Sequence, residues 1–535
     1  MKIKALLTSL FLIGYIAVSF AQEHNSAFSI QHSGYHKATP RREIRHLITH
    51  DGSLIEESNP MLRASGEYIM TKFPTMGVVK APVILAAFSD VPFSADSVII
   101  KTLLSKRYNA DNYSEDVNFK EYSKVYGREI AVQVDIPGSA RDYFRDQSFG
   151  QFVPQFDVIG PVTLSKERAY YGGNNNSGND KNARSMILEA CQKAYQQGLT
   201  DFTDYDNDGD GEVDIVYVVY AGYDEAQSYI EECIWAHAYN ISLTLDNGMR
   251  VNRYACSGEL VIDLPVVAGI GTFVHEFSHI LGLPDFYNTQ NTSSTKLTMD
   301  YWSVMDYGNY TAEGFVPCAY TAFERYSLGW LPMHTLDAPD TMSIGTTDEE
   351  RKGYRIFTKD LDNVDFITAS DTSSFYLIET IRNEGWNKYA FAEGLLISQV
   401  TYNAKAWQDN KVNAGSAHRH YIVPANNSWS INESEGYNPR KHLYGSVNKE
   451  FTPTSTPASI TQFGVTMNKP LTDISYNTQT GKTTFHFRGG NMVDKVDETK
   501  ELNSGISIYY DLLGRPIENP SRGIYIQNGK KVMIK

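Results

Sequence analysis

The sequence has little cysteine, no long internal apolar run, and fewer basic than acidic residues. Its 4 cysteines in 535 residues are too few for a disulfide scaffold. Beyond the first 21 residues, no stretch approaches the roughly 20 apolar residues that cross a bilayer, so we expect no transmembrane anchor. The chain has 48 Lys and Arg and 63 Asp and Glu, which gives a net charge of -15. This negative charge argues against a nucleic-acid partner.

The composition is that of a folded chain, and its N-terminus is typical of an exported one. Hydrophobic residues make up 41% and charged residues 21%, and the length predicts two to four domains. Lys2 and Lys4 precede an apolar stretch over 5–20 that ends near the small residues Ser19 and Ala21. We predict a signal peptide over 1–21 and a secreted protein; the alternative is an uncleaved membrane anchor. The polar residues 22–78 are then a pro-segment or an N-terminal extension.

The middle of the chain alternates strand and helix patterns, and its later part is rich in strand patterns. Continuous apolar runs predict buried strands at 81–88 and 213–220. Residues 181–198 predict a helix with one apolar face. Beyond residue 331 the predicted strands are 375–378, 394–400 and 483–487. We therefore expect an α+β domain over 79–335 and a β-rich domain over 336–489.

One segment carries a metal-ligand pattern of two histidines and an adjacent glutamate. On a helix, His275 and His279 lie one turn apart on the same face, where two imidazoles can hold one Zn²⁺. Glu276 can take a proton from water that the metal activates. Gly282 can end the helix, so that Asp285 returns as a third, oxygen ligand. The alternative is a core helix with hydrogen-bonded histidines.

With a methionine about twenty residues further on, this sequence resembles the immune inhibitor A-like metallopeptidases, a secreted group of metzincins. The segments that carry the resemblance are 83–85, 88–90, 204–222, 234–237, 269–271, 275–287, 302–305, 376–379 and 394–397. It implies a metzincin-type zincin domain over 79–335, with a mixed twisted sheet and an active-site helix.

The same resemblance implies a role for each site residue. These residues are the zinc ligands His275, His279 and Asp285, the general base Glu276, and the turn residues Met305 and Tyr307. Met305 would form a hydrophobic floor under the metal, and the Tyr307 hydroxyl would help to hold the oxyanion. Metzincins more often end this motif in histidine, so Asp285 departs from the common pattern.

An acidic loop over 204–214 places carboxylates at alternate positions around glycines, a spacing that suits the six to eight oxygen ligands of Ca²⁺. One frame starts at Asp206 with Gly211 in the sixth position, and a competing frame starts at Asp204. Neither frame has the glutamate that closes an EF-hand loop. The ligands of the first frame are Asp206, Asp208, Asp210, the carbonyl of Glu212, and Asp214. The alternative is a solvated acidic turn; bound calcium would stabilise the fold and not catalyse.

The cysteines allow three pairings, and all of them lie in the predicted first domain: Cys191, Cys233, Cys256 and Cys318. Cys233 and Cys256 flank a predicted hairpin and are the favoured pair. A free, buried Cys191 fits equally well.

The C-terminus forms a separate small β module over 490–535, behind a polar linker at 494–500. Short strand patterns flank Asn528-Gly529, which is a strong two-residue hairpin signal. The segment resembles the C-terminal sorting signal of type IX secretion, in its D-L-x-G-R and G-I-Y-I-x-N-G-K-K patterns. The resemblance implies a secretion machinery as partner; the alternative is a terminal hairpin docked on the preceding domain.

The combined hypothesis is a secreted, monomeric zinc endopeptidase that acts on proteins or peptides, with calcium as a structural ion. One rival is a different zincin whose third ligand is Glu313 or Glu324. Another is a calcium-stabilised surface adhesin that keeps a vestigial zinc site.

Overall fold

The computed structural model describes most of the chain beyond residue 72. The described residues are 73–94, 97–111, 135–176, 179–260, 267–290, 294–359, 374–490, 509–511, 516–517, 520–527 and 530–534. They divide into two compact units, Met1–Gly490 and Asn491–Lys535. The predicted signal peptide, nearly all of the predicted pro-segment and the polar linker lie outside the described residues. Among the described helices, none has both the length and the apolar character needed to cross a membrane.

A mixed sheet forms the first half of the larger unit. Its strands are β1 (Gly77–Ala87), β2 (Phe152–Thr163), β3 (Glu212–Val213), β4 (Val216–Tyr223), β5 (His237–Thr244) and β6 (Arg250–Leu260). The order is β2-β1-β4-β6, all parallel, and β3 pairs with β6 in the same register as β4. Strand β5 pairs antiparallel with β6. The strand predicted at 81–88 is confirmed as β1, and the one predicted at 213–220 is divided into β3 and β4 by Asp214 and Ile215. Their apolar residues suit a sheet that is buried on both faces.

The helices of this half include α5 (Ser97–Asn109), α8 (Ala140–Gln147), α9 (Arg168–Tyr171), α10 (Ala183–Gln196), α11 (Glu225–Ser228) and α12 (Gly271–Ile280). Aromatic side chains join α12 to the sheet, because Phe273 lies 4.2 Å from the ring of Tyr217 on β4. The ring of Tyr108 on α5 stacks on Phe273 at 4.2 Å, and Phe144 on α8 lies 5.1 Å from Phe277. Packing against two helices and a sheet holds α12 rigidly in the core.

The helix predicted over 181–198 is confirmed as α10. Its buried residues are Ala183, Met186, Ile187, Ala190, Cys191 and Ala194, the face that the helical spacing predicts. Gly198 follows the helix with φ of +67°, a conformation that favours glycine. The local pattern alone was therefore enough to orient this helix.

Two further sheets follow in the second half of the unit. Before them lie η1 (Thr203–Tyr205), η2 (Asp300–Trp302), η3 (Tyr307–Gly314) and α13 (Ala322–Ser327). One sheet has the order β12-β11-β10-β9-β7, with β7 (Met333–Thr335), β9 (Gly353–Phe357), β10 (Ser374–Ile381), β11 (Gly394–Thr401) and β12 (His420–Ile422). The other has the order β13-β14-β8, with β8 (Asp340–Ile344), β13 (Leu471–Asn477) and β14 (Lys482–Phe487). Short helices complete this half: α14 (Thr347–Glu350), η4 (Gly385–Asn387), α15 (Ala404–Gln408), η5 (Glu433–Glu435) and η6 (Pro439–Lys441). The three strands predicted beyond residue 331 are confirmed.

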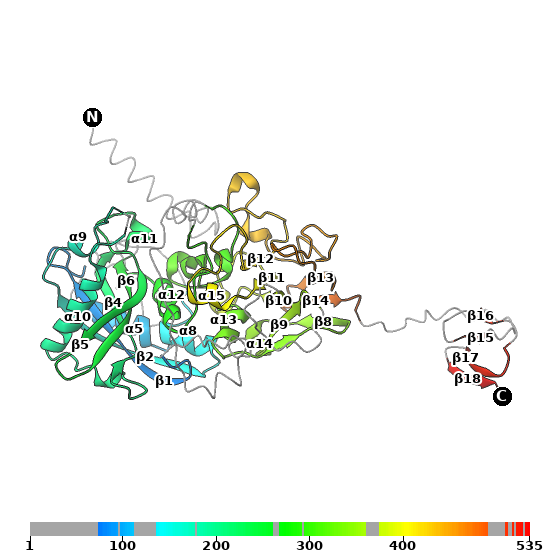
Figure 1. The fold of residues 1–535 in the computed structure, drawn as a ribbon, viewed down its shortest axis with the longest axis horizontal. Helices are drawn as coiled ribbons and strands as arrows, with labels where there is room; N and C mark the ends of the chain where they lie inside the picture. Colours follow the sequence, from blue (N-terminus) through cyan, green and yellow to red (C-terminus); the bar gives the residue numbers. More distant parts are fainter. Residues whose placement is uncertain are drawn as a thin grey trace. The chain divides into compact units, whose positions relative to one another are not determined.

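The two halves share one hydrophobic core, which extends from Phe73 to Leu443. At their junction the ring of Phe323 on α13 lies 6.0 Å from Phe375 on β10 and 5.5 Å from Trp407 on α15. In Figure 1, α12 lies between the strands of the first half and the helices α13 and α15. The strand-rich half therefore packs directly against the region of the metal-ligand motif.

The four cysteines are buried and none of them takes part in a disulfide, so the predicted pair of Cys233 with Cys256 is wrong. The predicted hairpin exists as β5 and β6, but its antiparallel register places His237 opposite Cys256. The Cys256 Sγ lies 3.5 Å from Nδ1 of His237. The position across the hairpin that a disulfide requires is thus taken by a histidine, four residues after Cys233.

The C-terminal unit is a small four-stranded sheet with the order β16-β15-β17-β18. Its strands are β15 (Tyr509–Tyr510), β16 (Pro516–Ile517), β17 (Gly523–Gln527) and β18 (Lys530–Ile534). Strands β17 and β18 pair antiparallel, with Gln527 opposite Lys530. This register is the one that a two-residue turn at Asn528-Gly529 requires, although those two residues lie outside the described part. Its role in sorting stays a prediction.

Candidate metal centre

Helix α12 carries the two histidines and ends at a glycine-dependent cap. All of its residues are buried. After the helix, the Gly282 N–H donates to the His279 carbonyl and the Leu283 N–H to the Ser278 carbonyl, each at 3.1 Å. These two bonds form a Schellman motif, which needs a residue of positive φ, and Gly282 has φ of +103°. The chain therefore reverses where the sequence predicts, and the next residues return past the histidines.

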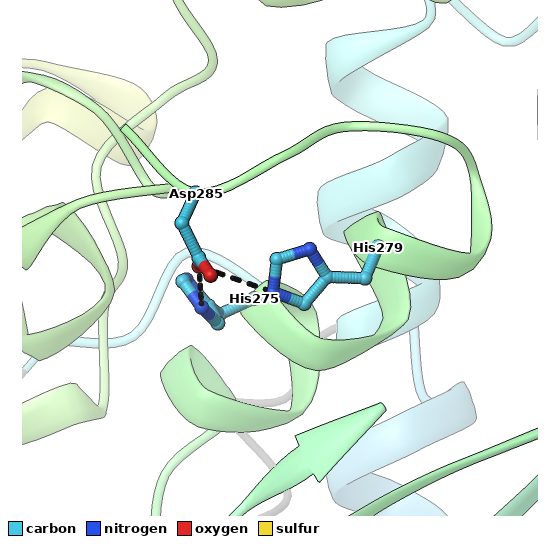
Figure 2. A group of neighbouring side chains, drawn as sticks. All are labelled: His275, His279 and Asp285. Atoms are coloured by element: carbon cyan, nitrogen blue, oxygen red, sulfur yellow. Dashed lines mark ion pairs between the residues drawn. The ribbon is translucent and has the colours of Figure 1, made fainter. Parts of the chain in front are cut away.

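The return of the chain brings the three predicted ligands together, as Figure 2 shows. Asp285 Oδ1 lies 3.2 Å from Nε2 of His275 and 3.2 Å from Nε2 of His279. All three side chains are buried. The ligand atoms thus converge on one point, as the ligands of a single metal ion must.

The second nitrogen of each imidazole is held by a backbone carbonyl. Nδ1 of His275 lies 2.7 Å from the carbonyl oxygen of Val304, and Nδ1 of His279 lies 2.8 Å from that of Leu283. A carbonyl only accepts, so each Nδ1 carries the hydrogen and each neutral ring leaves an Nε2 lone pair facing Asp285. Metal-binding histidines are commonly oriented this way. Among the described residues, the cluster contains two imidazole nitrogens, one carboxylate oxygen and no fourth protein ligand. This set of ligands fits a catalytic zinc site.

The Asp285 carboxylate has a second partner that sequence reasoning missed. Asn410 Nδ2 donates to Asp285 Oδ2 at 2.6 Å, and the Asp285 N–H donates to Asn410 Oδ1 at 2.7 Å. Asn410 follows α15, in the strand-rich half, 125 residues from Asp285. No local spacing or periodicity marks such a residue, because only the tertiary fold brings it to the centre.

Charges within the cluster shift the pKa values of its members in opposite directions. Burial favours the neutral form of Asp285, but the charges of the two histidines and their hydrogen bonds outweigh it and hold the pKa of Asp285 well below its usual range. For His275, burial opposes protonation, but the hydrogen bond with Asp285 and the charges of Glu276 and Asp285 raise its pKa. Both shifts favour the charged forms of Asp285 and His275, so a metal ion and a proton compete for the His275 imidazole.

Glu276 is buried beside the histidines, among groups that respond to its charge. Burial and then the charge of Glu276 raise the pKa of Tyr217 on β4. Burial, together with the charge of Glu276, raises the pKa of Asp224 to about 7. For Tyr310 on η3, burial acts first, and the charges of Asp224 and Glu276 also raise its pKa. Sequence reasoning did not single out Tyr310, which lies on η3 beyond the predicted Met-turn.

The predicted Met-turn supports the cluster through its backbone. The Asp306 N–H closes the turn on the Ser303 carbonyl at 3.1 Å. Within the turn, the carbonyl of Val304 holds His275, and that of buried Met305 accepts from the Phe286 N–H at 2.8 Å. The turn therefore contacts both the helix and the residue after the third ligand.

Tyr307 is buried at the start of η3. Burial, with the charges of Asp306, Tyr301 and Asp300, raises its pKa. Its ring lies 6.0 Å from that of Tyr301. A role for the Tyr307 hydroxyl at the oxyanion stays a prediction.

The carboxylates of the rival zincin hypothesis have other surroundings. Glu324 accepts from Ser303 Oγ at 2.7 Å and from Thr321 at both its N–H and its Oγ, which makes it the capping-box residue of α13. Glu313 lies in η3 with φ of +57°. The carboxylate grouped with the two histidines is that of Asp285.

The acidic loop brings together three of its five predicted calcium ligands. Carboxylate oxygens of Asp206, Asp208 and Asp210 lie within 4.8 Å of one another. Asp206 accepts from the N–H of Gly209 at 2.7 Å and from that of Gly211 at 2.9 Å, which fits the frame that starts at Asp206.

The other two predicted calcium ligands have partners outside this group. Asp214 Oδ2 accepts from the N–H of Asn207 at 2.9 Å and from its Nδ2 at 2.8 Å. The Glu212 carboxylate lies 3.8 Å from Arg250. The frame assigns calcium to the carbonyl of Glu212 and not to this carboxylate, so the ion pair is compatible with it.

Comparisons with known proteins identify similar chains. The family model described as immune inhibitor A peptidase M6, catalytic domain, matches residues 73–331. The pre-pro-metalloprotease PrtV of Vibrio cholerae serotype O1, in two strains, is 28% identical over 375 residues, which are 61% of this chain and 39% of that protein. Immune inhibitor A of Bacillus thuringiensis subsp. alesti is 27% identical over 241 residues, 39% of this chain and 35% of that protein. The chain thus spans less than two fifths of the length of each of these curated relatives.

Proposed function

We propose that the protein is an exported zinc endopeptidase of the immune inhibitor A peptidase M6 family, whose catalytic-domain model matches residues 73–331. The observation that carries the proposal is the convergence of three side chains on one point. Asp285 Oδ1 lies 3.2 Å from His275 Nε2 and 3.2 Å from His279 Nε2. Two imidazoles and one carboxylate are a ligand set that catalytic zinc takes in peptidases, and the match to a peptidase family favours zinc over other metals.

The residues of the centre divide the work of peptide hydrolysis. Zinc, when bound, supplies a Lewis acid that polarises a carbonyl and makes water more acidic. His275, His279 and Asp285 would hold it. Glu276 takes the proton of the attacking water and then returns it to the leaving amine. The buried surroundings of Glu276 exclude bulk solvent and so strengthen its action on charges that develop nearby.

The variant Glu276→Gln tests this assignment because it removes the base and keeps the ligands. We expect it to bind one zinc per chain, like the wild type, and to hydrolyse casein about 10²–10⁴-fold more slowly. Zinc content by atomic emission and casein cleavage are measured on the same samples. Wild-type cleavage in the variant would overturn the role of Glu276. A zinc-bound wild type that cleaves no protein would instead support the adhesin.

Calcium at the acidic loop is the second metal that we propose. The support is the group of Asp206, Asp208 and Asp210, together with the backbone N–H groups that fold the loop around Asp206. The loop leads directly into β3 and β4, so an ion here would fasten the loop to the sheet. Its role would be stability, because the zinc centre lies on a different element, α12.

Export is proposed from the two ends of the chain. Lys2 and Lys4 before an apolar stretch are typical of a signal peptide, and the C-terminal unit has the β strands that its sorting-like sequence predicts. The substrates would then be extracellular proteins or peptides. Detection of the full-length protein only inside the producing cell would contradict this proposal.

A further inference from the structure

We propose that Asn410 is a positioning residue for the third metal ligand, so that a segment of the strand-rich half sets the metal affinity of a centre built on α12. This inference rests on the proposed function, because it assumes that His275, His279 and Asp285 hold the metal. It goes beyond that function by assigning a determinant of the centre outside the region that matches the peptidase family, residues 73–331.

The contact between Asn410 and Asp285 consists of two hydrogen bonds in opposite directions. The Asn410 amide donates to Asp285 Oδ2 at 2.6 Å and accepts from the Asp285 N–H at 2.7 Å. One bond fixes the carboxylate and the other fixes the backbone that carries it. Because Oδ2 is held by Asn410, Oδ1 is the oxygen that faces both histidines. The carboxylate is therefore presented through one oxygen, which leaves coordination room for water and substrate.

An amide side chain can do both parts of this contact, since it carries a donor and an acceptor of fixed geometry. The position also restricts the residue type, because Asn410 has φ of +54°. Asparagine is among the few non-glycine residues that adopt such a conformation readily. Its side chain is 1% exposed, as is that of Asp285. Loss of the amide would therefore leave the buried Asp285 carboxylate without its hydrogen-bond donor, which costs free energy because water does not reach it.

Asn410 is itself anchored to the loop that it orients. Its carbonyl accepts from Thr289 Oγ1 at 2.8 Å, and its N–H donates to the Trp407 carbonyl at 3.2 Å. The Trp407 indole then donates to the carbonyl of Gly282 at 3.0 Å. The segment Trp407–Asn410 thus contacts the ligand loop before, at and after Asp285. A rigid support of this kind is what holds a metal ligand in a productive geometry.

A neighbouring asparagine offers a matched control. Asn413 is also buried, and its amide donates to the carbonyls of Phe286 and His420. It supports the same loop, but through the backbone and not through the carboxylate of a ligand. If Asn410 only stabilises the loop, its removal and that of Asn413 should have the same kind of effect. If Asn410 orients the ligand, its removal should change the metal site itself.

The experiment compares Asn410→Gly with Asn413→Gly in the full chain. Glycine accepts the backbone conformation at 410, so the first substitution removes the amide without adding strain. Zinc affinity is measured by competition with a chelating dye, the geometry of the site by the visible absorption of the cobalt form, and stability by the melting temperature without metal. We expect Asn410→Gly to bind zinc about 10–100-fold more weakly, with an altered cobalt spectrum. We expect Asn413→Gly to melt earlier, with zinc affinity within about threefold of wild type and the wild-type spectrum.

A second variant covers the case in which Asn410→Gly does not fold. Asn410→Asp keeps the size of the side chain and the acceptor for the Asp285 N–H, but it turns an oxygen toward Asp285 Oδ2. It should also alter the cobalt spectrum and weaken zinc binding. Wild-type zinc affinity and spectrum in either Asn410 variant, or an equal loss in Asn413→Gly, would overturn the inference alone. A wild-type chain that binds no zinc would overturn the proposed function as well.

Discussion

Each proposed ligand of the candidate metal centre is oriented through a polar atom that the metal would not use. For the histidines this atom is Nδ1, held by the carbonyls of Val304 and Leu283. For Asp285 it is Oδ2, held by Asn410. The three supports come from the Met-turn, the loop after α12 and the strand-rich half. A side chain that is already held in place loses little conformational entropy when the metal binds. These three hydrogen-bonded supports should therefore raise the metal affinity of the site.

Gly282 is the residue on which the return of the ligand loop depends. An L side chain at φ of +103° costs about 1–3 kcal/mol in strain, so we expect Gly282→Ala to lower the free energy of unfolding by about that amount. The variant should also weaken zinc binding, because the carbonyl of Leu283, the next residue, holds His279. Denaturant unfolding and zinc titration measure the two effects.

Gly198→Ala is the matched control, since Gly198 also has a positive φ and follows a helix, α10, that carries no metal ligand. It should lose a similar stability and keep the zinc affinity of the wild type. Equal zinc binding in Gly282→Ala and wild type would show that the loop forms without the glycine.

At the scale of elements, the sequence predicted what local pattern determines. The buried face of α10 follows from apolar spacing, and the buried strands β1 and β4 follow from continuous apolar runs. The helix that carries His275 and His279 follows from the spacing of its two histidines. The convergence of Asp285 was also predictable, because a glycine cap gives a helix end one direction of return.

What the sequence did not show depends on contacts between distant elements. Asn410 meets Asp285 only because the strand-rich half packs on the ligand loop. The electrostatic link between Glu276 and Tyr310 depends on how η3 lies against α12. The disulfide prediction failed for the same reason, since the register of β5 and β6, and not the spacing of the cysteines, places His237 opposite Cys256. Periodicity carries no information about such registers.

The acidic loop before β3 leads to a prediction about calcium. Burial, with the charges of Asp208 and Asp206, raises the pKa of Asp214 to about 6, although Asn207 lowers it. A raised carboxylate pKa means that the folded loop without metal loses stability as pH rises from about 4 to 6. Calcium should offset this loss, by ~2.7 kcal/mol at a hundredfold excess over its Kd.

The measurement is the melting temperature of metal-free protein at pH 7, before and after calcium alone is added. We expect a rise in wild type and none in Asp208→Asn, which removes a carboxylate oxygen from the group. Since zinc is absent from both samples, the proposed zinc site does not contribute to the change in melting temperature. The same rise in the variant would mean that calcium binds elsewhere. No rise in wild type would mean that the loop is a solvated acidic turn and not a calcium site.

At the scale of the whole molecule, the part that matches the peptidase family ends at residue 331, but the core does not. Phe323 packs against Phe375 and Trp407, and Asn410 holds Asp285. The strand-rich half thus supplies apolar surface and a polar contact to the candidate metal centre. The C-terminal unit, Asn491–Lys535, in contrast has its own sheet.

Two truncated chains should therefore behave in opposite ways. A chain that ends at Gly490 should melt at the wild-type temperature and bind zinc with wild-type affinity, because it keeps the whole shared core. A chain that ends at Thr335 exposes the faces of Phe323 and Phe286 that Phe375 and Trp407 cover, and it also lacks Asn410. Loss of buried aromatic contacts typically costs about 3–5 kcal/mol for each large side chain, which approaches the whole stability of a domain.

We expect this chain to be insoluble or to show no cooperative melting transition, and to bind no zinc. Calorimetry and zinc analysis of both chains decide the matter, and a shorter chain that melts cooperatively with bound zinc would show that the metal centre is complete without the second half.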